Sequence, residues 1–393
     1  MGWDVDRVRS LFPSLKRLEG GQPLVYLDGP AGSQVPQSVA DRISHVLIHH
    51  SANRSGEFIT SREVDAVMAE AHQAAADWFC VPDPRSIAFG PNMTSLTLQL
   101  SRALARTWKP GDEVLVSSLD HDANFTPWVL AARDAGATVR TIAIDPSDAT
   151  LCMDSLQSQL STKTRLVAVT AASNAVGSLT DIRQIAQMAH AVGAEVFVDA
   201  VHYAPHRRMD IAAWDCDYAV CSAYKFYGPH IGLLYGRPER MQSLVPYKLR
   251  PSPDSIPGRW MTGTQNHACI AGVTAAIDYI ADLAGTSGAT GSRRERLDAA
   301  FDAIERYETQ LIASLLDGLQ SLPGVRVYGI VDPGKLHLRA PTVSFTVTGS
   351  DSHTVATMLG KHGICAWHGN YYALPLTTAL GVEPAGMVRL GCM

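Results

Sequence analysis

The sequence predicts an α/β protein with a large domain, built on a mostly parallel sheet covered by helices on both faces, and a smaller α/β domain near the C-terminal end. Helical and strand patterns alternate from about residue 64 to residue 223, and the strand segments are apolar throughout. Strands that are apolar on both faces and separated by helices are typical of a parallel sheet buried on both sides. In such sheets ligands bind at the carboxyl ends of the strands.

The elements of the large domain follow one another in a regular order. Helical patterns cover residues 64–79, 95–107, 126–136 and 181–193. Short apolar runs predict strands at residues 86–90, 113–118, 138–144, 165–173, 194–200, 218–223 and 231–235.

A second, smaller unit follows residues 285–294 (GTSGATGSRR), whose Gly, Ser and Thr content predicts a mobile loop between domains. Residues 296–322 then predict a long amphipathic helix, and its apolar face contains Leu297, Phe301, Ile304, Leu311, Leu315 and Leu319. Strands at 325–329 and 342–347, a helix near 353–362 and a strand ending at Trp367 complete the pattern. We therefore expect a large domain at 20–280 and a small domain formed by 1–19 and 281–393.

Composition limits the classes of function. A hydrophobic fraction of 46% with 18% charged residues is typical of a globular protein, and the net charge of −5 provides no basic surface for nucleic acid or an anionic membrane. The seven cysteines are odd in number and include no CxxC pair, which favours reduced thiols in the cytoplasm. The start MGWDVDRVRS lacks the apolar segment of a signal peptide, and no run reaches membrane-spanning length. We expect a cytoplasmic protein.

Lys225 lies in SAYKFYGPHIGLLYG, between two apolar strand segments. An ammonium at a buried strand end loses solvation, and a lysine with a lowered pKa is the kind that forms Schiff bases. The alternative is a lysine whose long side chain reaches water, which is common at strand ends.

Other polar residues also follow predicted strands. Asp199 ends AEVFVDA, where a buried acid needs a cationic partner such as a pyridinium nitrogen, or caps the next segment. His121 follows EVLVSS and can lie flat against a cofactor ring, or be an ordinary loop histidine. The turn at Asn92, Met93 and Thr94 opens a helix and presents amides to a phosphate. With Asn174 and Ser222 at further strand ends, these are the parts that a pyridoxal phosphate site requires.

The motifs occur in an order that resembles one known family. D-H-x-A-N…PW, S-N-x-x-G, V-D-A, S-x-x-K-x-Y-G-P-x-x-G-x-L-Y and G-T-x-N together resemble the class V aminotransferases, which are fold-type I pyridoxal phosphate enzymes, in their cysteine desulfurase-like branch. The match spans about residues 26–389. The resemblance implies a fold like that of aspartate aminotransferase, pyridoxal 5'-phosphate as cofactor, and a homodimer with sites shared between subunits.

The resemblance also implies roles for single residues around the cofactor ring. Lys225 matches the Schiff-base lysine and Asp199 the partner of the pyridinium nitrogen. His121 matches the residue stacked on the ring. Asn174 and His202 match the positions that contact the phenolic oxygen, although many relatives carry glutamine where His202 stands.

Further positions match the ends of the cofactor and the substrate. Ser222 and the turn Asn92–Thr94 match the phosphate site, where Tyr224 replaces a common histidine. Thr264 resembles the threonine that reaches the phosphate of the neighbouring subunit. Arg389 in VRLG matches the arginine that holds the substrate α-carboxylate, a task that suits a bidentate guanidinium.

One segment departs from the family pattern. Desulfurases of this branch carry R-x-G-H-H-C-A, whereas this chain has W-H-G-N-Y-Y-A, so Tyr372 stands where the nucleophilic thiol would be. A phenol cannot accept sulfane sulfur as a thiolate does. Cys365, seven residues earlier in GICAW, is expected to be a buried core residue. Trp367 replaces the arginine, and with Asn370 and Tyr371 it predicts a more aromatic substrate pocket.

These residues predict carbon–sulfur β-elimination from a cysteine S-conjugate. Lys225 would form the Schiff base and abstract the α-proton, Asp199 would keep the ring protonated, and Tyr372 or Tyr371 would protonate the leaving sulfur, with pyruvate and ammonia as further products. An aminotransferase, an amino-acid epimerase and a decarboxylation-coupled oxidative deaminase would use the same residues and stay open.

The sequence also allows two functions of other classes, a metal site and a pyridoxal phosphate protein without activity. His45, His49 and His50 have the spacing of a metal site, but the glutamate of HExxH is absent and a solvated helix face is preferred, so no metal is expected. A pyridoxal phosphate protein without activity stays open, because the chain stops at VRLGCM where relatives continue.

Overall fold

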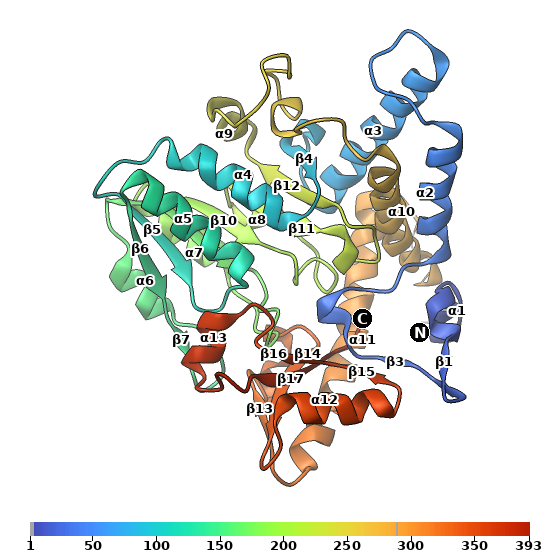
Figure 1. Cartoon of the computed structure of the whole chain (residues 1–393), viewed down its shortest axis with the longest axis vertical. Coiled ribbons are helices and arrows are strands. Elements are labelled where there is room, and N and C mark those ends of the chain that lie inside the picture. The colour runs from blue at the N-terminus through green and yellow to red at the C-terminus, as the bar shows by residue number, and fades with distance from the viewer. Residues whose placement is uncertain (1–3, 288–289) are drawn as a thin grey trace.

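A seven-stranded sheet forms the centre of the larger part of the molecule (Figure 1). The computed structural model describes residues 4–287 and 290–393. The strands of this sheet are β4 (Ile87–Gly90), β5 (Glu113–Ser117), β6 (Thr138–Ile142), β9 (Thr164–Thr170), β10 (Glu195–Asp199), β11 (Tyr218–Ser222) and β12 (Gly232–Gly236). Their order is β4-β12-β11-β10-β9-β5-β6, and β12 is the one strand of this sheet that runs opposite to the other six. The predicted, mostly parallel sheet is confirmed.

Helices cover both faces of this sheet (Figure 1). Within β5, Leu115 packs in one apolar cluster, whereas Val114 and Val116 pack in another on the opposite face. Helices α3 (Ile59–Trp78), α7 (Ile182–Ala191) and α10 (His267–Leu283) contribute to the first cluster, and α4 (Met93–Ala105), α5 (Thr126–Ala135) and α9 (Pro238–Ser243) to the second. Burial on both sides is the reason why these strands lack polar alternation. The remaining helices here are α1 (Val5–Ser10), α2 (Gln37–His49), α6 (Met153–Gln159) and α8 (Ile211–Trp214).

The C-terminal part contains a four-stranded antiparallel sheet of order β13-β14-β17-β16. Its strands are β13 (Val325–Tyr328), β14 (Thr342–Val347), β16 (Trp367–Gly369) and β17 (Met387–Gly391). The long helix α11 (Arg293–Ser321) and helix α12 (Ser352–Lys361) pack with this sheet, and the short helix α13 (Leu374–Ala379) precedes β17. None of the described helices combines the length and apolar character needed to cross a membrane.

Helix α11 begins earlier than the sequence analysis predicted. The hydroxyl of Ser292 and the carboxylate of Glu295 form a capping box, so Arg293 and Arg294 are helical rather than part of a loop. Residues 288–289 of that predicted loop lie outside the described residues.

The buried face of α11 also differs from the prediction. Leu297, Phe301, Ile304 and Leu319 are buried as expected, but Ile312 and Leu316 are buried where Leu311 and Leu315 were expected. The face passes through Glu308, which is 5% exposed and whose Oε1 lies 2.8 Å from Nδ1 of the buried His206. The apolar pattern alone does not include the buried Glu308, and for this reason the predicted apolar face is shifted by one residue from the observed one.

A segment from the N-terminal end pairs with the C-terminal part. Strand β3 (Val25–Tyr26) runs parallel to β15 (Ile364–Cys365), and Asp28 forms a bridge with Gly391. The 3-10 turn η2 (Gly29–Ala31) follows and leads toward the larger sheet. Two hairpins, β1 (Leu18–Glu19) with β2 (Gln22–Pro23) and β7 (Ile144–Asp145) with β8 (Thr150–Leu151), lie outside the main sheets. The domain boundaries given above stay a prediction.

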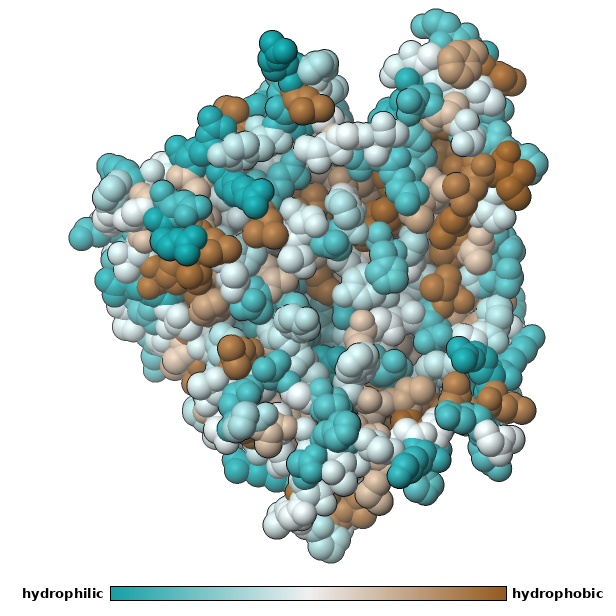
Figure 2. Space-filling model, viewed as in Figure 1, coloured by the Kyte–Doolittle hydropathy of each residue, from teal (hydrophilic) through white to brown (hydrophobic). Residues whose placement is uncertain are grey.

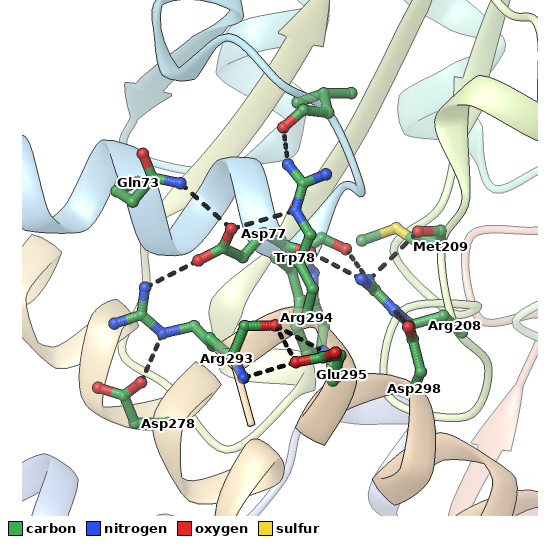
Figure 3. A network of polar contacts seen from close by, with 12 residues as sticks. Gln73, Asp77, Trp78, Arg208, Met209, Asp278, Arg293, Arg294, Glu295 and Asp298 are labelled. Carbon is green, nitrogen blue, oxygen red and sulfur yellow. Dashed lines mark hydrogen bonds and ion pairs between the residues drawn. The ribbon is translucent and has the colours of Figure 1, made fainter. Parts of the chain in front are cut away.

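A network of charged residues fixes the start of α11 to the larger part (Figure 3). Asp77, near the end of α3, accepts hydrogen bonds from Arg293 Nη1 at 3.0 Å and Arg294 Nε at 3.2 Å. Arg208 donates to the carbonyl oxygens of Asp77 and Trp78 and forms an ion pair with Asp298 at 2.6 Å. The helix that carries the C-terminal part is therefore tied to α3 by several charge-assisted hydrogen bonds.

We predict that Asp77→Ala lowers the free energy of unfolding by about 2 kcal/mol, because two arginines lose a buried carboxylate partner. Denaturant unfolding of the purified protein measures this change. Asp298→Ala is the control, since its side chain is 59% exposed and an exposed ion pair contributes about 0–1 kcal/mol. Equal effects of the two substitutions would contradict the prediction.

Candidate active site

A cavity of about 760 Å³ lies at the carboxyl ends of the parallel strands. Thr170, Asp199 and Ser222, the last residues of β9, β10 and β11, all line it, as expected for a sheet of this kind. The cavity brings together fifteen residues named from the sequence: Asn92, Met93, Thr94, His121, Asn174, Asp199, His202, Ser222, Tyr224, Lys225, Trp367, Asn370, Tyr371, Tyr372 and Arg389. Thr264 does not line it and lies on an exposed loop before α10.

Lys225 ends the 3-10 turn η5 (Ala223–Lys225), directly after β11. Its ammonium donates a hydrogen bond to the carbonyl oxygen of Pro30 and lies 4.9 Å from the centre of the Tyr224 ring. The pKa of Lys225 is lowered to about 7, mainly by burial and also by the charge of Arg389, while Asp199 acts in the opposite direction. A large fraction of Lys225 is therefore uncharged at neutral pH, and the uncharged amine is the nucleophilic form.

Asp199 is 4% exposed at the end of β10. Its Oδ1 accepts a hydrogen bond from the backbone N–H of Val201 at 2.8 Å, so it closes a local turn and caps no helix. Burial raises the pKa of Asp199 to about 6, against the effects of this hydrogen bond and of Lys225. A buried carboxylate with so few partners is suited to a cationic N–H group in the cavity.

His121 contributes a flat, neutral ring. Its Nδ1 accepts a hydrogen bond from Ala123 at 3.0 Å, and burial, with the nearby charge of Lys225, lowers the pKa of His121 to about 4. The ring stacks on that of Tyr372, with 5.4 Å between centres and 23° between planes. These two rings form an aromatic wall of the cavity.

Asn174, Tyr371 and Arg389 are linked across the two parts of the chain. Asn174 Nδ2 donates to the carbonyl oxygen of Tyr371 at 2.9 Å, and Arg389 Nη1 donates to the carbonyl oxygen of Asn174 at 2.8 Å. The amide oxygen of Asn174 is buried and has no hydrogen-bond partner within the described chain. Burial lowers the pKa of Arg389 to about 10, so the guanidinium stays charged at neutral pH and its remaining N–H groups suit a carboxylate.

His202 follows β10 by three residues and lies beside the start of β14. Its Nε2 is 2.9 Å from the hydroxyl oxygen of Thr342, which begins β14. Burial, with the charges of His206 and Lys225, holds the pKa of His202 well below its ordinary value. A neutral imidazole at this place can exchange hydrogen bonds with a phenolic oxygen.

The turn before α4 faces the end of β11. The backbone N–H of Met93 donates to Ser222 Oγ at 2.9 Å, and the side chain of Asn92 caps the helix by accepting from Ser95 N at 2.9 Å. Gly232 permits this approach, because a Cβ there would lie 2.4 Å from the carbonyl carbon of Asn92. The helix N-terminus and the Ser222 hydroxyl thus form a cradle suited to a phosphate.

The segment after β16 forms the outer wall of the cavity. Tyr371 and Tyr372 both have left-handed backbones, with φ of 55° and 59°, and the carbonyl oxygen of Tyr372 accepts from Asp122 N at 2.7 Å. The Tyr371 hydroxyl donates to the carbonyl oxygen of Met387. Tyr372 is 71% exposed, and its hydroxyl makes no hydrogen bond with the part of the chain described.

None of the seven cysteines, all of which are described, lines this cavity. Cys365 is half-buried in β15 rather than a core residue, because β15 pairs only with the short β3. Burial raises the pKa of the Cys365 thiol, and the charge of Asp28 raises it further.

Several lining residues were not found from the sequence, among them Pro30, His230, His368 and Glu383. Pro30 and Glu383 belong to the turns LDGPAG and GVEPAG, and the Gly-Pro or Glu-Pro pair in each was the available signal. The sequence pattern marks such turns but does not show that they meet at one cavity.

The chain is similar to several known proteins over almost its whole length. A model of the family described as aminotransferase class-V matches residues 25–393. A cysteine desulfurase of Dickeya dadantii (strain 3937) is 32% identical over 395 residues, covering 97% of this chain and 90% of the relative. The apo structure of a cysteine desulfurase from Thermococcus onnurineus NA1 has a TM-score of 0.87 and 25% identity, covering 100% of this chain and 94% of the other. A variant of a protein named C-DES, with glycine covalently linked to pyridoxal phosphate, has the same fold at 20% identity and a TM-score of 0.77, covering 98% and 94% of the two chains.

We predict that Lys225 reacts with acetic anhydride in its neutral form with a midpoint near pH 7, in protein stripped of small molecules. Below this pH the protonated ammonium is unreactive, and above it the free amine reacts; an ordinary lysine needs a pH near its pKa of about 10.4. Peptide mass spectrometry measures both Lys225 and the exposed Lys361 as internal reference. A Lys225 midpoint above pH 9 would disprove the prediction.

Proposed function

Because the chain belongs to the class V aminotransferase family, we propose that it is a carbon–sulfur lyase that eliminates the sulfur substituent from the β-carbon of a cysteine S-conjugate. The chain is a pyridoxal phosphate-dependent enzyme of this family. The observation that carries the more specific proposal is the outer wall of the cavity, which presents the phenol of Tyr372 and no thiol.

The residues of the cavity fit the cofactor. Asp199 is a buried acid in need of a cationic N–H, Asn174 has an unpartnered buried oxygen, and the turn before α4 offers N–H groups to an anion. We assign the aldehyde to Lys225, the ring nitrogen to Asp199, the ring face to His121, the phenolic oxygen to Asn174 and His202, and the phosphate to Ser222, Asn92, Met93, Thr94 and Tyr224. When bound, pyridoxal phosphate supplies an electron sink for charge that develops at the substrate α-carbon.

The protein residues supply binding and proton transfer. The guanidinium of Arg389 binds the α-carboxylate, which orients the Cα–H bond. With a pKa of about 7, lowered by burial, Nζ of Lys225 can accept the α-proton at neutral pH. The Cβ–S bond then breaks, and the sulfur leaves with the bonding electrons and takes up a proton. The other product is 2-aminoacrylate, which water converts to pyruvate and ammonia.

Tyr372 is the better candidate for the acid that protonates the leaving sulfur. Burial raises the pKa of Tyr371 above its ordinary value, and its hydroxyl is already bonded to the carbonyl oxygen of Met387. The Tyr372 hydroxyl is free of hydrogen bonds to the described chain and lies beside the cavity. We assign Trp367, Asn370 and Tyr371 to contacts with the substrate.

The names of the relatives favour a second candidate, a desulfurase that acts on L-cysteine itself. Such a reaction leaves alanine and places the sulfur on a protein thiol. The position of Cys365, half-buried and outside the cavity lining, supports elimination over this route.

We predict that the enzyme releases pyruvate and a thiol from S-alkyl cysteines, and pyruvate with sulfide from L-cysteine. Tyr372→Phe should lower kcat by about 10²-fold or more for alkylthiol leaving groups, which need a proton, and much less for arylthiol groups, which leave as stable anions. Mass spectrometry and a coupled pyruvate assay measure the products.

Tyr371→Phe is the matched control and should lack this dependence on the leaving group. Lys225→Ala should abolish turnover of every substrate. Alanine with a protein persulfide would establish the desulfurase instead, and a keto acid with the aminated cofactor would establish transamination.

We also propose a cytoplasmic homodimer in which Thr264 of one subunit reaches the phosphate site of the other. Thr264 is exposed, and the hollow it lines also contains His230, which borders the active-site cavity. Figure 2 shows hydrophobic side chains over the region of α2, where Leu47 and Ile48 are exposed. An apolar surface of this kind supports contact with a second copy. The seven unpaired cysteines support a reducing compartment.

We predict that Thr264→Ala lowers turnover because the phosphate loses a partner, and that mixing Lys225→Ala and Thr264→Ala homodimers, after dissociation and reassociation, raises activity above that of either variant alone. A hybrid has one site with both native residues, so a statistical mixture should reach about a quarter of wild-type activity. Turnover of the mixture against each variant alone measures this. Absence of recovery despite hybrid formation would exclude the shared site.

A further inference from the structure

Glu383 is a carboxylate of the cavity wall that the mechanism does not use. It lies in the turn between α13 and β17, six residues before Arg389, and is half-buried. Its Oε1 accepts a hydrogen bond from Thr377 Oγ1, and Glu383 forms no ion pair with any described residue. Its negative charge is therefore left for a cation from outside the chain.

The amino-acid part of a substrate does not supply that cation. In the proposed function the α-amino group would be used at the cofactor, next to Lys225, and the α-carboxylate would bind Arg389. Among the described lining residues, Asp199 is the only other carboxylate, and it lies at the end of β10 on the cofactor side. Glu383 instead lines the cavity with Trp367 and Tyr372, which also belong to the C-terminal part of the chain. We place the sulfur substituent on this side.

The neighbouring side chains also favour a cation. Trp367, Tyr371 and Tyr372 line this wall, and the faces of such rings attract cations. The Tyr371 ring already accepts one, because the guanidinium carbon of Arg389 lies 4.2 Å from its centre. Trp367 is 52% exposed at the edge of the cavity, and its ring is free to contact a ligand. A carboxylate beside aromatic faces disfavours an anionic substituent.

The cavity has room for such a substituent. Its volume of about 760 Å³ is within the range of roughly 300–1,000 Å³ that holds drug-sized ligands. We infer that the substrate is a cysteine S-conjugate whose sulfur substituent ends in an ammonium group, and that Glu383 binds this ammonium. The inference rests on the function proposed above and specifies its substrate class.

Three conjugates of similar size test the charge: S-(2-aminoethyl)-, S-propyl- and S-(carboxymethyl)-L-cysteine. For the holoenzyme, kcat/KM for the aminoethyl conjugate should exceed that of the other two about tenfold or more. Glu383→Gln should remove this preference mainly by raising KM for the aminoethyl conjugate, with the propyl conjugate almost unchanged. Equal kcat/KM values for the three conjugates, or a preference that survives in Glu383→Gln, would overturn the inference.

A purely structural role of Glu383 is tested separately. Thr377→Val removes the hydrogen bond that holds the turn but leaves the carboxylate, so it should retain the aminoethyl preference. Loss of the preference in Thr377→Val to the same extent as in Glu383→Gln would assign the effect to the turn and overturn ammonium binding.

A binding readout separates this inference from the proposed lyase activity. L-lysine and L-2-aminoheptanoate are the sulfur-free isosteres of the aminoethyl and propyl conjugates, and absorbance of the bound cofactor reports their Kd in the holoenzyme. L-lysine should bind to the wild type about tenfold more tightly than L-2-aminoheptanoate does. The two compounds should bind equally to Glu383→Gln. If none of the conjugates yields pyruvate while L-lysine keeps its advantage, the proposed elimination fails and the ammonium site stands. If the two isosteres bind equally, the ammonium site fails whatever the reaction is.

Discussion

Withdrawal of the Lys225 ammonium from water is the constraint on which the rest of the site depends. The amine donates a hydrogen bond to the carbonyl oxygen of Pro30 and forms no ion pair with any described residue. The two nearest charges act in opposite directions, since Arg389 lowers and Asp199 raises the pKa of Lys225. Burial decides the balance, and the pKa of about 7 allows the same nitrogen to act as nucleophile and as proton acceptor at neutral pH.

This arrangement needs both parts of the chain at once. Ser33 binds the carbonyl oxygen of Tyr224 through its N–H and its hydroxyl, both at 3.0 Å, which fixes the turn that carries Pro30 beside Lys225. The same N-terminal segment pairs with β15, and its Asp28 forms a bridge with Gly391, two residues after Arg389. The same N-terminal segment therefore contacts both the turn that carries Lys225 and the strand that carries Arg389. The contacts of Asp77 with α11 hold the C-terminal part in place (Figure 3).

The difference between predicted and unpredicted residues has a physical origin. Lys225, Asp199 and Ser222 follow parallel strands, and local hydrophobic patterns suffice to locate strand ends that must meet at one edge of a sheet. Pro30 and Glu383 reach the cavity only through pairing between distant segments, which no local period encodes. The predicted buried face of α11 differs from the observed one because of a contact between distant residues. Glu308 is buried since His206, 102 residues away, provides its partner.

The backbone of the outer wall connects this architecture to the chemistry. Tyr371 and Tyr372 both adopt left-handed conformations, which cost bulky residues about 1–3 kcal/mol each and persist only when neighbours enforce them. Asn174 and Asp122 do so here, by hydrogen bonds to the two tyrosine carbonyl oxygens. The two phenols therefore differ: the Tyr371 hydroxyl donates to the carbonyl oxygen of Met387, whereas the Tyr372 hydroxyl has no hydrogen-bond partner among the described residues and its ring stacks on His121. A phenol can give a proton to a departing sulfur, whereas storage of the sulfur needs a thiolate. Under the proposed elimination, this is the step in which the two tyrosines would differ.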